Sequence, residues 1–297
     1  MATTISSTLS DEIISQKALQ AFTAELAPLR AFSTSFSDEA AAKGSVVQVP
    51  LLANLSASTT ENDYETDTGS MGVVSVPLDR YQKCTVSITD RQWSESSAAV
   101  LEQFAEQQAK AVARAAIADI WAIILNAAYS AKTTKTSSAF ASGDVVAIRK
   151  SLSNADVPAT DRALILSPDY YVKLMQDVTI TVASALHYGG TEVIREGIIP
   201  RYLGFELIES TIIPANGESL TGFAVHPSAM AVAFRTLAPQ EPGEYLESRT
   251  VTDEKTGISL GYRRHYSQAK GKHFCTFEAV YGRAKGVAEG LHRIVSA

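Results

Sequence analysis

Residues 94–129 read SESSAAVLEQFAEQQAKAVARAAIADIWAIILNAAY and form the longest periodic segment of the chain. The segment contains no Gly or Pro, and Ser94 is a suitable N-cap. Apolar side chains follow the 3.6-residue period of one helix face, at Leu101, Phe104, Ala105, Ala109, Val112, Ala116, Ile120 and Ile124. We predict a single helix, about 50 Å long at 1.5 Å per residue. Globular helices average about 11–12 residues, so this length indicates an unusual architecture.

Two short segments before this helix have the composition of paired strands. Residues 45–52 (SVVQVPLL) and 72–78 (GVVSVPL) are rich in Val, and each contains a proline that a central strand would not accommodate. They therefore predict edge strands or an isolated two-stranded ribbon, with residues 53–71 as its polar tip. Such a ribbon is barely stable alone in water and needs something outside itself to lie on.

The chain begins with an arm of about 35 residues that is rich in alanine and serine. Its apolar side chains have partial helical periodicity, which Pro28 interrupts. The arm is too short to bury these side chains alone. We expect it to pack on another part of this chain or on another copy.

The remaining segments predict a mixture of helices and strands. Asp144 can cap a helix over residues 145–152, and Ser167-Pro168 is a helix-start signal. Residues 131–142 read as a loop. Strands are predicted over residues 81–89, 162–166, 204–209, 222–225, 245–251, 257–265 and 273–281, and in a last run to Val295. This pattern places the chain in the α+β class.

Composition excludes several functional classes. The formal net charge is −6, whereas a protein that grips nucleic acid along its surface is usually basic; a protein that only encloses DNA needs no positive charge. No run reaches about 18 apolar residues, and the start of the chain has no secretory pattern, so we expect no membrane partner. Cys84 and Cys275 lack metal-ligand spacing, and we expect both to be buried or half-buried in a protein of a reducing cytosol.

One short pattern matches a catalytic motif. Residues 257–261 (GISLG) read Gly-x-Ser-x-Gly, as in a nucleophile elbow, where the serine lies between a strand and a helix. Here a turn precedes Ser259, β-type residues follow it, and no Asp lies downstream. We therefore expect Ser259 to be a strand residue, with a serine hydrolase as a remote alternative. No phosphate-binding loop or zinc-protease helix occurs either, so we predict no catalytic residue, cofactor or metal.

The predicted ribbon tip is acidic. Its carboxylates are Glu61, Asp63, Glu65 and Asp67. Their spacing resembles the start of a calcium loop, but Gly69 falls one position late and Val74 stands where a bidentate Glu is required. We expect instead a solvated tip or a contact with basic residues of a neighbouring copy. The candidate basic residues are Arg249, Arg263 and Arg264, for which a solvated face is the alternative.

The order of these parts resembles the major capsid protein of tailed phages with the Hong Kong 97-type fold. The resemblance implies an N-terminal arm (1–43), an extended β-hairpin loop (44–92), a spine helix with the start of the peripheral domain (93–142), an axial domain (143–238) and a peripheral-domain return (239–297). Residues 222–235 (GFAVHPSAMAVAFR) look like the family's strand, short polar turn and Ala-rich segment.

This resemblance implies a structural protein rather than an enzyme. Copies would assemble into pentamers and hexamers of an icosahedral shell around double-stranded DNA, in the host bacterial cytoplasm, as part of a virion. Scaffolding, portal and decoration proteins are the further partners; because only a short arm precedes the ribbon, scaffolding would be a separate protein or absent. Some members link subunits through a loop lysine and a peripheral asparagine. Residues 53–71 contain no Lys and residues 240–297 no Asn, so we predict no such link. The alternatives are an encapsulin-type nanocompartment or a gene-transfer particle shell.

Overall fold

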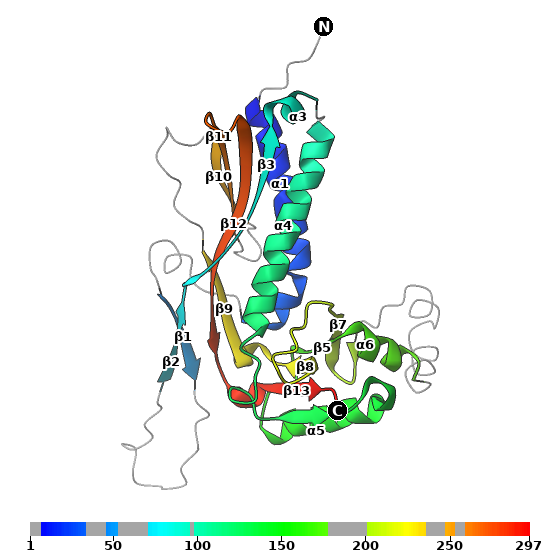
Figure 1. Cartoon of the computed structure of the whole chain (residues 1–297). Coiled ribbons are helices and arrows are strands. Elements are labelled where there is room, and N and C mark those ends of the chain that lie inside the picture. The colour runs from blue at the N-terminus through cyan, green and yellow to red at the C-terminus, as the bar shows by residue number, and fades with distance from the viewer. Residues whose placement is uncertain are drawn as a thin grey trace.

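The computed structural model describes residues 7–33, 46–52, 71–95, 98–177, 201–235, 247–252 and 259–297. Figure 1 shows two long helices side by side against one sheet, and a second unit of sheet and helices at the C-terminal end of the longer helix. The two helices are α1 (Ser7–Glu25) and α4 (Ala98–Trp121). None of the described helices is both long and apolar enough to cross a membrane.

The prediction of one helix over residues 94–129 is wrong at both ends. A short helix, α3 (Asp90–Glu95), contains Ser94, so this serine is not the N-cap of α4. At the start of α3, Thr89 and Gln92 form a capping box: the Thr89 N–H donates to Gln92 Oε1 at 3.1 Å and the Gln92 N–H to Thr89 Oγ1 at 3.3 Å.

The C-terminal end of α4 is fixed by a side chain from a distant loop. The Asn216 amide donates to the carbonyl oxygens of Trp121 at 3.0 Å and Ile124 at 2.9 Å. These carbonyl groups are therefore satisfied without another helical turn. Residues 122–129 form turns instead, which bury Ile124 and Tyr129 in the core.

The N-terminal arm packs on this chain itself, one of the two possibilities that the sequence left open. Ala18 and Phe22 of α1 belong to the same buried cluster as Ala109 and Ala116 of α4. The small alanines allow the two helices to approach closely. After α1 the chain continues into a 3₁₀ helix, η1 (Ala27–Ala31), which begins next to Pro28, so the predicted interruption is confirmed.

The first sheet is antiparallel and lies against α1 and α4 (Figure 1). Its strands, in spatial order, are β10 (Glu247–Thr252), β11 (Ser259–Ser267), β12 (Lys272–Lys285) and β3 (Arg80–Thr89), and β9 (Met230–Arg235) pairs with the far half of β12. The alternation predicted for residues 81–89 is confirmed, because Tyr81, Lys83, Thr85 and Ser87 are exposed while Ile88 is buried.

The predicted ribbon is a separate two-stranded sheet. Strands β1 (Val46–Leu52) and β2 (Met71–Pro77) pair antiparallel, with Val46 opposite Pro77 and Leu52 opposite Met71. In Figure 1 the ribbon projects from the first sheet, away from α4. The prolines of both strands are thus found where the sequence predicted, in a ribbon rather than in a central strand.

The second sheet has the order β4-β13-β8-β5-β7-β6. These strands are β4 (Lys132–Thr134), β13 (Leu291–Val295), β8 (Leu220–Val225), β5 (Arg162–Leu166), β7 (Phe205–Glu209) and β6 (Arg201–Tyr202), and 3₁₀ turns occur at η2 (Ser137–Ala139), η3 (Pro227–Ala229) and η4 (Ala288–Gly290). Strand β4 lies in a stretch predicted to be loop only. It forms because it pairs in parallel with the distant β13, which no local pattern reveals.

Two helices cover one face of the second sheet. They are α5 (Ser142–Asn154) and α6 (Pro168–Met175), and both pack on a cluster that includes Leu164 and Ala224. The helix predicted after Ser167 is confirmed as α6. Asp144 is not the cap residue of α5 but its third residue, where its carboxylate accepts the Ala141 N–H at 3.1 Å. The opposite face shares the core of α4, with Phe223 edge-on to Trp121.

Candidate functional site

The base of the ribbon lies directly on the first sheet. Val47, Val76 and Leu78 are buried in a cluster with small residues of β9 and β12: Ala231, Ala233, Val280 and Ala284. At Gly282 the approach is closest, because a Cβ atom there would stand 2.3 Å from the carbonyl oxygen of Pro77. The surface that the ribbon needs outside itself is therefore supplied, at its base, by the same chain.

Polar contacts hold the point where the ribbon joins the sheet. On the face toward α4, Asp119 accepts the Tyr281 hydroxyl at 3.1 Å and lies 3.4 Å from Arg283 and 3.9 Å from Arg80. On the opposite face, the next residue, Tyr81, donates its hydroxyl to Glu278 at 2.6 Å. Consecutive residues of β3 are thus attached to different partners on the two faces of the sheet.

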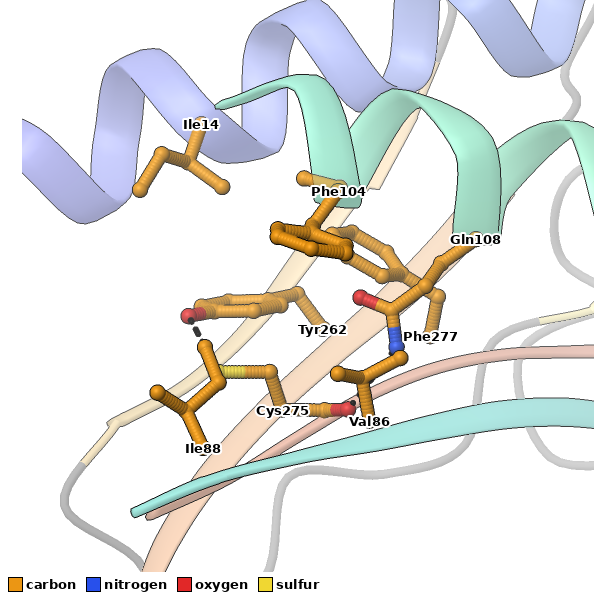
Figure 2. Close-up of a pocket in the computed structure, with 9 residues that line it drawn as sticks. Ile14, Val86, Ile88, Phe104, Gln108, Tyr262, Cys275 and Phe277 are labelled. Carbon is orange, nitrogen blue, oxygen red and sulfur yellow. Dashed lines mark hydrogen bonds between the residues drawn. The ribbon is translucent and has the colours of Figure 1, made fainter. Parts of the chain in front are cut away.

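A small cavity lies between the helices and the first sheet, as Figure 2 shows. Its volume is about 20 Å³, enough for one water molecule, and its lining is mainly apolar. Gln108 reaches down from α4 and donates from its amide nitrogen to the carbonyl oxygens of Cys84 at 3.3 Å and Cys275 at 3.1 Å. Both cysteines are half-buried, as expected. The cavity therefore serves packing, and its lining offers no acid–base pair.

A buried guanidinium joins the end of α4 to the second sheet. Arg293 of β13 is 1% exposed and donates to the Tyr129 carbonyl oxygen at 2.7 Å and to Asn126 Oδ1 at 2.6 Å, and it pairs with Glu218. The neighbouring His292 lies within hydrogen-bond distance of Thr133 and Ser151. Burial, followed by the charge of Arg293, lowers the pKa of His292 to about 4, so its ring is neutral near neutral pH.

Residues 73–274, from the second ribbon strand to β12, match a family model described as phage capsid protein. The chain belongs to this family. A search among curated protein sequences returned no match.

Solved capsid structures share the fold of this capsid protein. A chain of Mycobacterium phage Che8 is 17% identical, with a TM-score of 0.62 over 89% of each chain. A capsid chain of an empty GTA particle is 13% identical (TM-score 0.58, 92% of this chain and 90% of that one). A virus-like particle from Pyrococcus furiosus is 11% identical (TM-score 0.57, 95% and 98%). The Hong Kong 97-type fold expected from the sequence is thus confirmed. The family match over residues 73–274 confirms the structural role in a phage capsid.

Among the residues predicted for the contact between copies, the structure does not bring together those that it describes. Glu61, Asp63, Glu65 and Asp67 lie outside the described residues. Arg249 pairs with Glu247 on the edge strand β10, and Arg263 lies 2.6 Å from Glu278. Arg264 is only 9% exposed. Arg263 and Arg264 are consecutive in a strand and so point to opposite faces, which means that the three arginines do not form one surface.

The catalytic alternative does not fit the local structure. Ser259 is the first residue of β11 and is 5% exposed. A nucleophile elbow requires a helix after the serine, whereas a strand follows here, so the strand prediction is confirmed. Within the described residues, no group of three or more His, Cys, Asp or Glu side chains is placed to hold a metal ion.

The sequence did not reveal Asp119, Glu278 or Arg293 as important residues. In the sequence, Asp119 is only one of several polar residues in the segment predicted to be the long helix. The single available signal was the abundance of basic residues near the C-terminus, which indicated charged contacts without their partners.

Proposed function

We propose that this chain is the major capsid protein of a tailed phage, and that its copies associate into pentamers and hexamers of a shell enclosing double-stranded DNA. The match of residues 73–274 to the capsid family carries this proposal. Residues 143–238 act as the axial domain at the centre of each ring. Residues 93–142 supply the spine helix and the start of the peripheral domain, and residues 239–297 supply the return of that domain.

The ribbon contacts a neighbouring copy. Among the described residues, β1 and β2 pair only with each other, and Val46 at the ribbon base is 43% exposed. A two-stranded ribbon gains stability when it lies on another surface. A contact between different patches of identical copies repeats around a ring, and rings then close into a shell.

The acidic tip forms the polar part of that contact. Glu61, Asp63, Glu65 and Asp67 meet basic residues of β10 and β11 in the next copy. Of the predicted arginines, Arg249 is the best placed, because its side chain is 28% exposed on an edge strand, whereas that of Arg263 is 13% exposed. No covalent link is needed.

Assembly takes place in the bacterial cytoplasm and the product is the virion capsid. Scaffolding, portal and decoration proteins act on the same shell. The fold is shared with a GTA particle and a virus-like particle, so the contents of the shell distinguish these related roles. Nucleic acid in purified shells supports the phage or gene-transfer role, whereas a protein cargo supports the nanocompartment role.

Expression of the chain alone, followed by negative-stain microscopy, tests the proposal. We expect closed shells of uniform size. On a reducing, denaturing gel, heated shells should give one band at the mass of the chain, 31.8 kDa. A chain that stays monomeric at all concentrations and salt conditions contradicts the proposed assembly, and a ladder of heavier bands contradicts the absence of a link.

A further inference from the structure

The C-terminal part of α4 lies against the point where the ribbon leaves the first sheet. Strand β2 ends at Pro77 and β3 begins at Arg80. Arg80 pairs with Tyr281 in the last position of the β3–β12 ladder, and from Val280 onward β12 also pairs with β9. The side chain of α4 that reaches this junction is Asp119.

Asp119 is held by groups from two strands. The hydroxyl of Tyr281 donates to it from β12, and a hydrogen bond also joins Tyr281 to the side chain of Gln82 in β3. Burial raises the pKa of Tyr281 to about 12, so the phenol keeps its proton and remains a donor. Arg80 adds a charge contact from β3 itself.

Arg283 makes the position of Asp119 difficult to change. Its side chain is 14% exposed, and among the described residues Asp119 is the carboxylate with which it pairs. One of its guanidinium nitrogens is buried without a hydrogen-bond partner in the described part of the chain. A buried guanidinium that loses its anion is strongly unfavourable, so Arg283 keeps Asp119, and with it α4, at the junction.

Contacts on the opposite face of the sheet also restrict the movement of the ribbon. Pro77 rests on Gly282, where no side chain could fit, and Tyr81 is tied to Glu278. The two residues between the ribbon and the sheet, Leu78 and Asp79, therefore have little freedom to rotate about the junction. Arg80, which lies 3.6 Å from Asp79 and 3.9 Å from Asp119, then connects the direction of the ribbon to α4.

We propose that Asp119 is a positioning residue that couples the long helix to the ribbon, so that every copy presents its ribbon at the same angle to the next copy. The inference rests on the proposed role of the ribbon as a contact with a neighbouring copy. Asp119 thereby affects the contact between the ribbon and the next copy through the direction of the ribbon, without being part of that contact.

Three single variants of the full chain, and the double variant of Asp119 and Arg80, test this role. Asp119→Asn removes the charge and keeps the shape. Arg80→Gln removes the partner on the ribbon side, together with its 3.6 Å contact with Asp79. Glu25→Gln is the matched control, because Glu25 pairs α1 with Arg114 of α4 and its side chain has the same 23% exposure as that of Asp119. It forms no hydrogen bond or ion pair with the described residues of the ribbon. The first measurement is amide hydrogen exchange of unassembled protein over residues 71–82, with β5 and β8 as internal references.

Exchange over residues 71–82 should become about tenfold faster in Asp119→Asn, the change expected when bonds to one charged group are lost. Arg80→Gln should give a smaller increase, and the double variant should not exceed Asp119→Asn, because the two residues act as one unit. The coupling is overturned if Glu25→Gln accelerates exchange over residues 71–82 as much as Asp119→Asn does. It is also overturned if the effects of Asp119→Asn and Arg80→Gln add in the double variant, or if Asp119→Asn leaves this exchange unchanged.

Shell size is the second measurement and separates this inference from the proposed function. Mixed sizes in Asp119→Asn, with uniform shells in Glu25→Gln, support the positioning role. Uniform shells despite faster ribbon exchange overturn it and leave the proposed capsid function intact. If the unmodified chain forms no shells, the proposed function fails, and the exchange data alone decide whether Asp119 fixes the ribbon.

Discussion

At the scale of single residues, His292 makes the stability of the second sheet depend on pH. Its pKa is lowered from 6.5 to about 4 in the folded state. Between these values the unfolded chain binds a proton that the folded chain does not, so stability falls as the pH falls from about 6.5 to 4. We expect protonation of His292 to lower the free energy of unfolding by about 2–3 kcal/mol between pH 6.5 and pH 4. Urea unfolding, followed through tryptophan fluorescence, measures this loss.

Substitution by glutamine isolates this contribution. His292→Gln keeps a polar group near Thr133 and Ser151 but does not titrate, so the loss of stability between pH 6.5 and 4 should shrink. His265→Gln is the control, since His265 stacks on Phe274 in the first sheet, away from these partners. Identical pH profiles for wild type and His292→Gln would show that the ring does not resist protonation.

Residue types were visible in the sequence, whereas their partners were not. The five-residue pattern around Ser259 could be judged correctly, because a nucleophile elbow is a local structure. Asp119 differs, because its partners at Arg80 and Arg283 are brought together only by the pairing of β3 with β12. Arg263 and Arg264 show the same limit of sequence-based prediction. They are adjacent in the sequence, which suggests one basic patch, but consecutive residues of a strand point to opposite faces of the sheet.

At the scale of elements, the ribbon was predictable and the helix boundaries were not. Proline in two Val-rich segments indicates edge strands or an isolated ribbon, whatever the rest of the chain does. The end of α4, in contrast, depends on Asn216, which approaches from a distant loop and satisfies the carbonyl groups of Trp121 and Ile124. Helical periodicity continues past Trp121 because the turns that follow also bury apolar side chains.

The contact between ribbon and sheet gives a prediction at this scale. In Gly282→Ala the new Cβ would lie 2.3 Å from the Pro77 carbonyl oxygen, so the ribbon base must lift. We expect a loss of about 1–3 kcal/mol in the free energy of unfolding, as for overpacked cores. Gly143→Ala is the control, because it has nothing within 4 Å and lies in α5, where Ala is favoured. Equal stability of the two variants would mean that the ribbon base is not held against β12.

At the scale of the whole molecule, the acidic tip links charge to assembly. The chain carries a formal charge of −6, so copies repel one another unless acidic and basic parts are brought together. We expect the variant with Glu61→Gln, Asp63→Asn, Glu65→Gln and Asp67→Asn to need about tenfold more protein to form shells, because a small loss at each contact is repeated around every ring. Light scattering over a concentration series measures this threshold.

Salt distinguishes a charge contact from a solvated tip. Ions shorten the screening length from about 10 Å at 0.1 M to about 3 Å at 1 M, so added salt should raise the assembly threshold of the wild type more than that of the neutralised variant. Arg249→Gln should raise the threshold as well, and combining it with the neutral tip should add little, because both changes remove the same contact. A neutral tip that assembles at the wild-type threshold, with an unchanged response to salt, would establish that the carboxylates are solvated. In that case the ribbon holds its neighbour through its backbone and apolar residues alone.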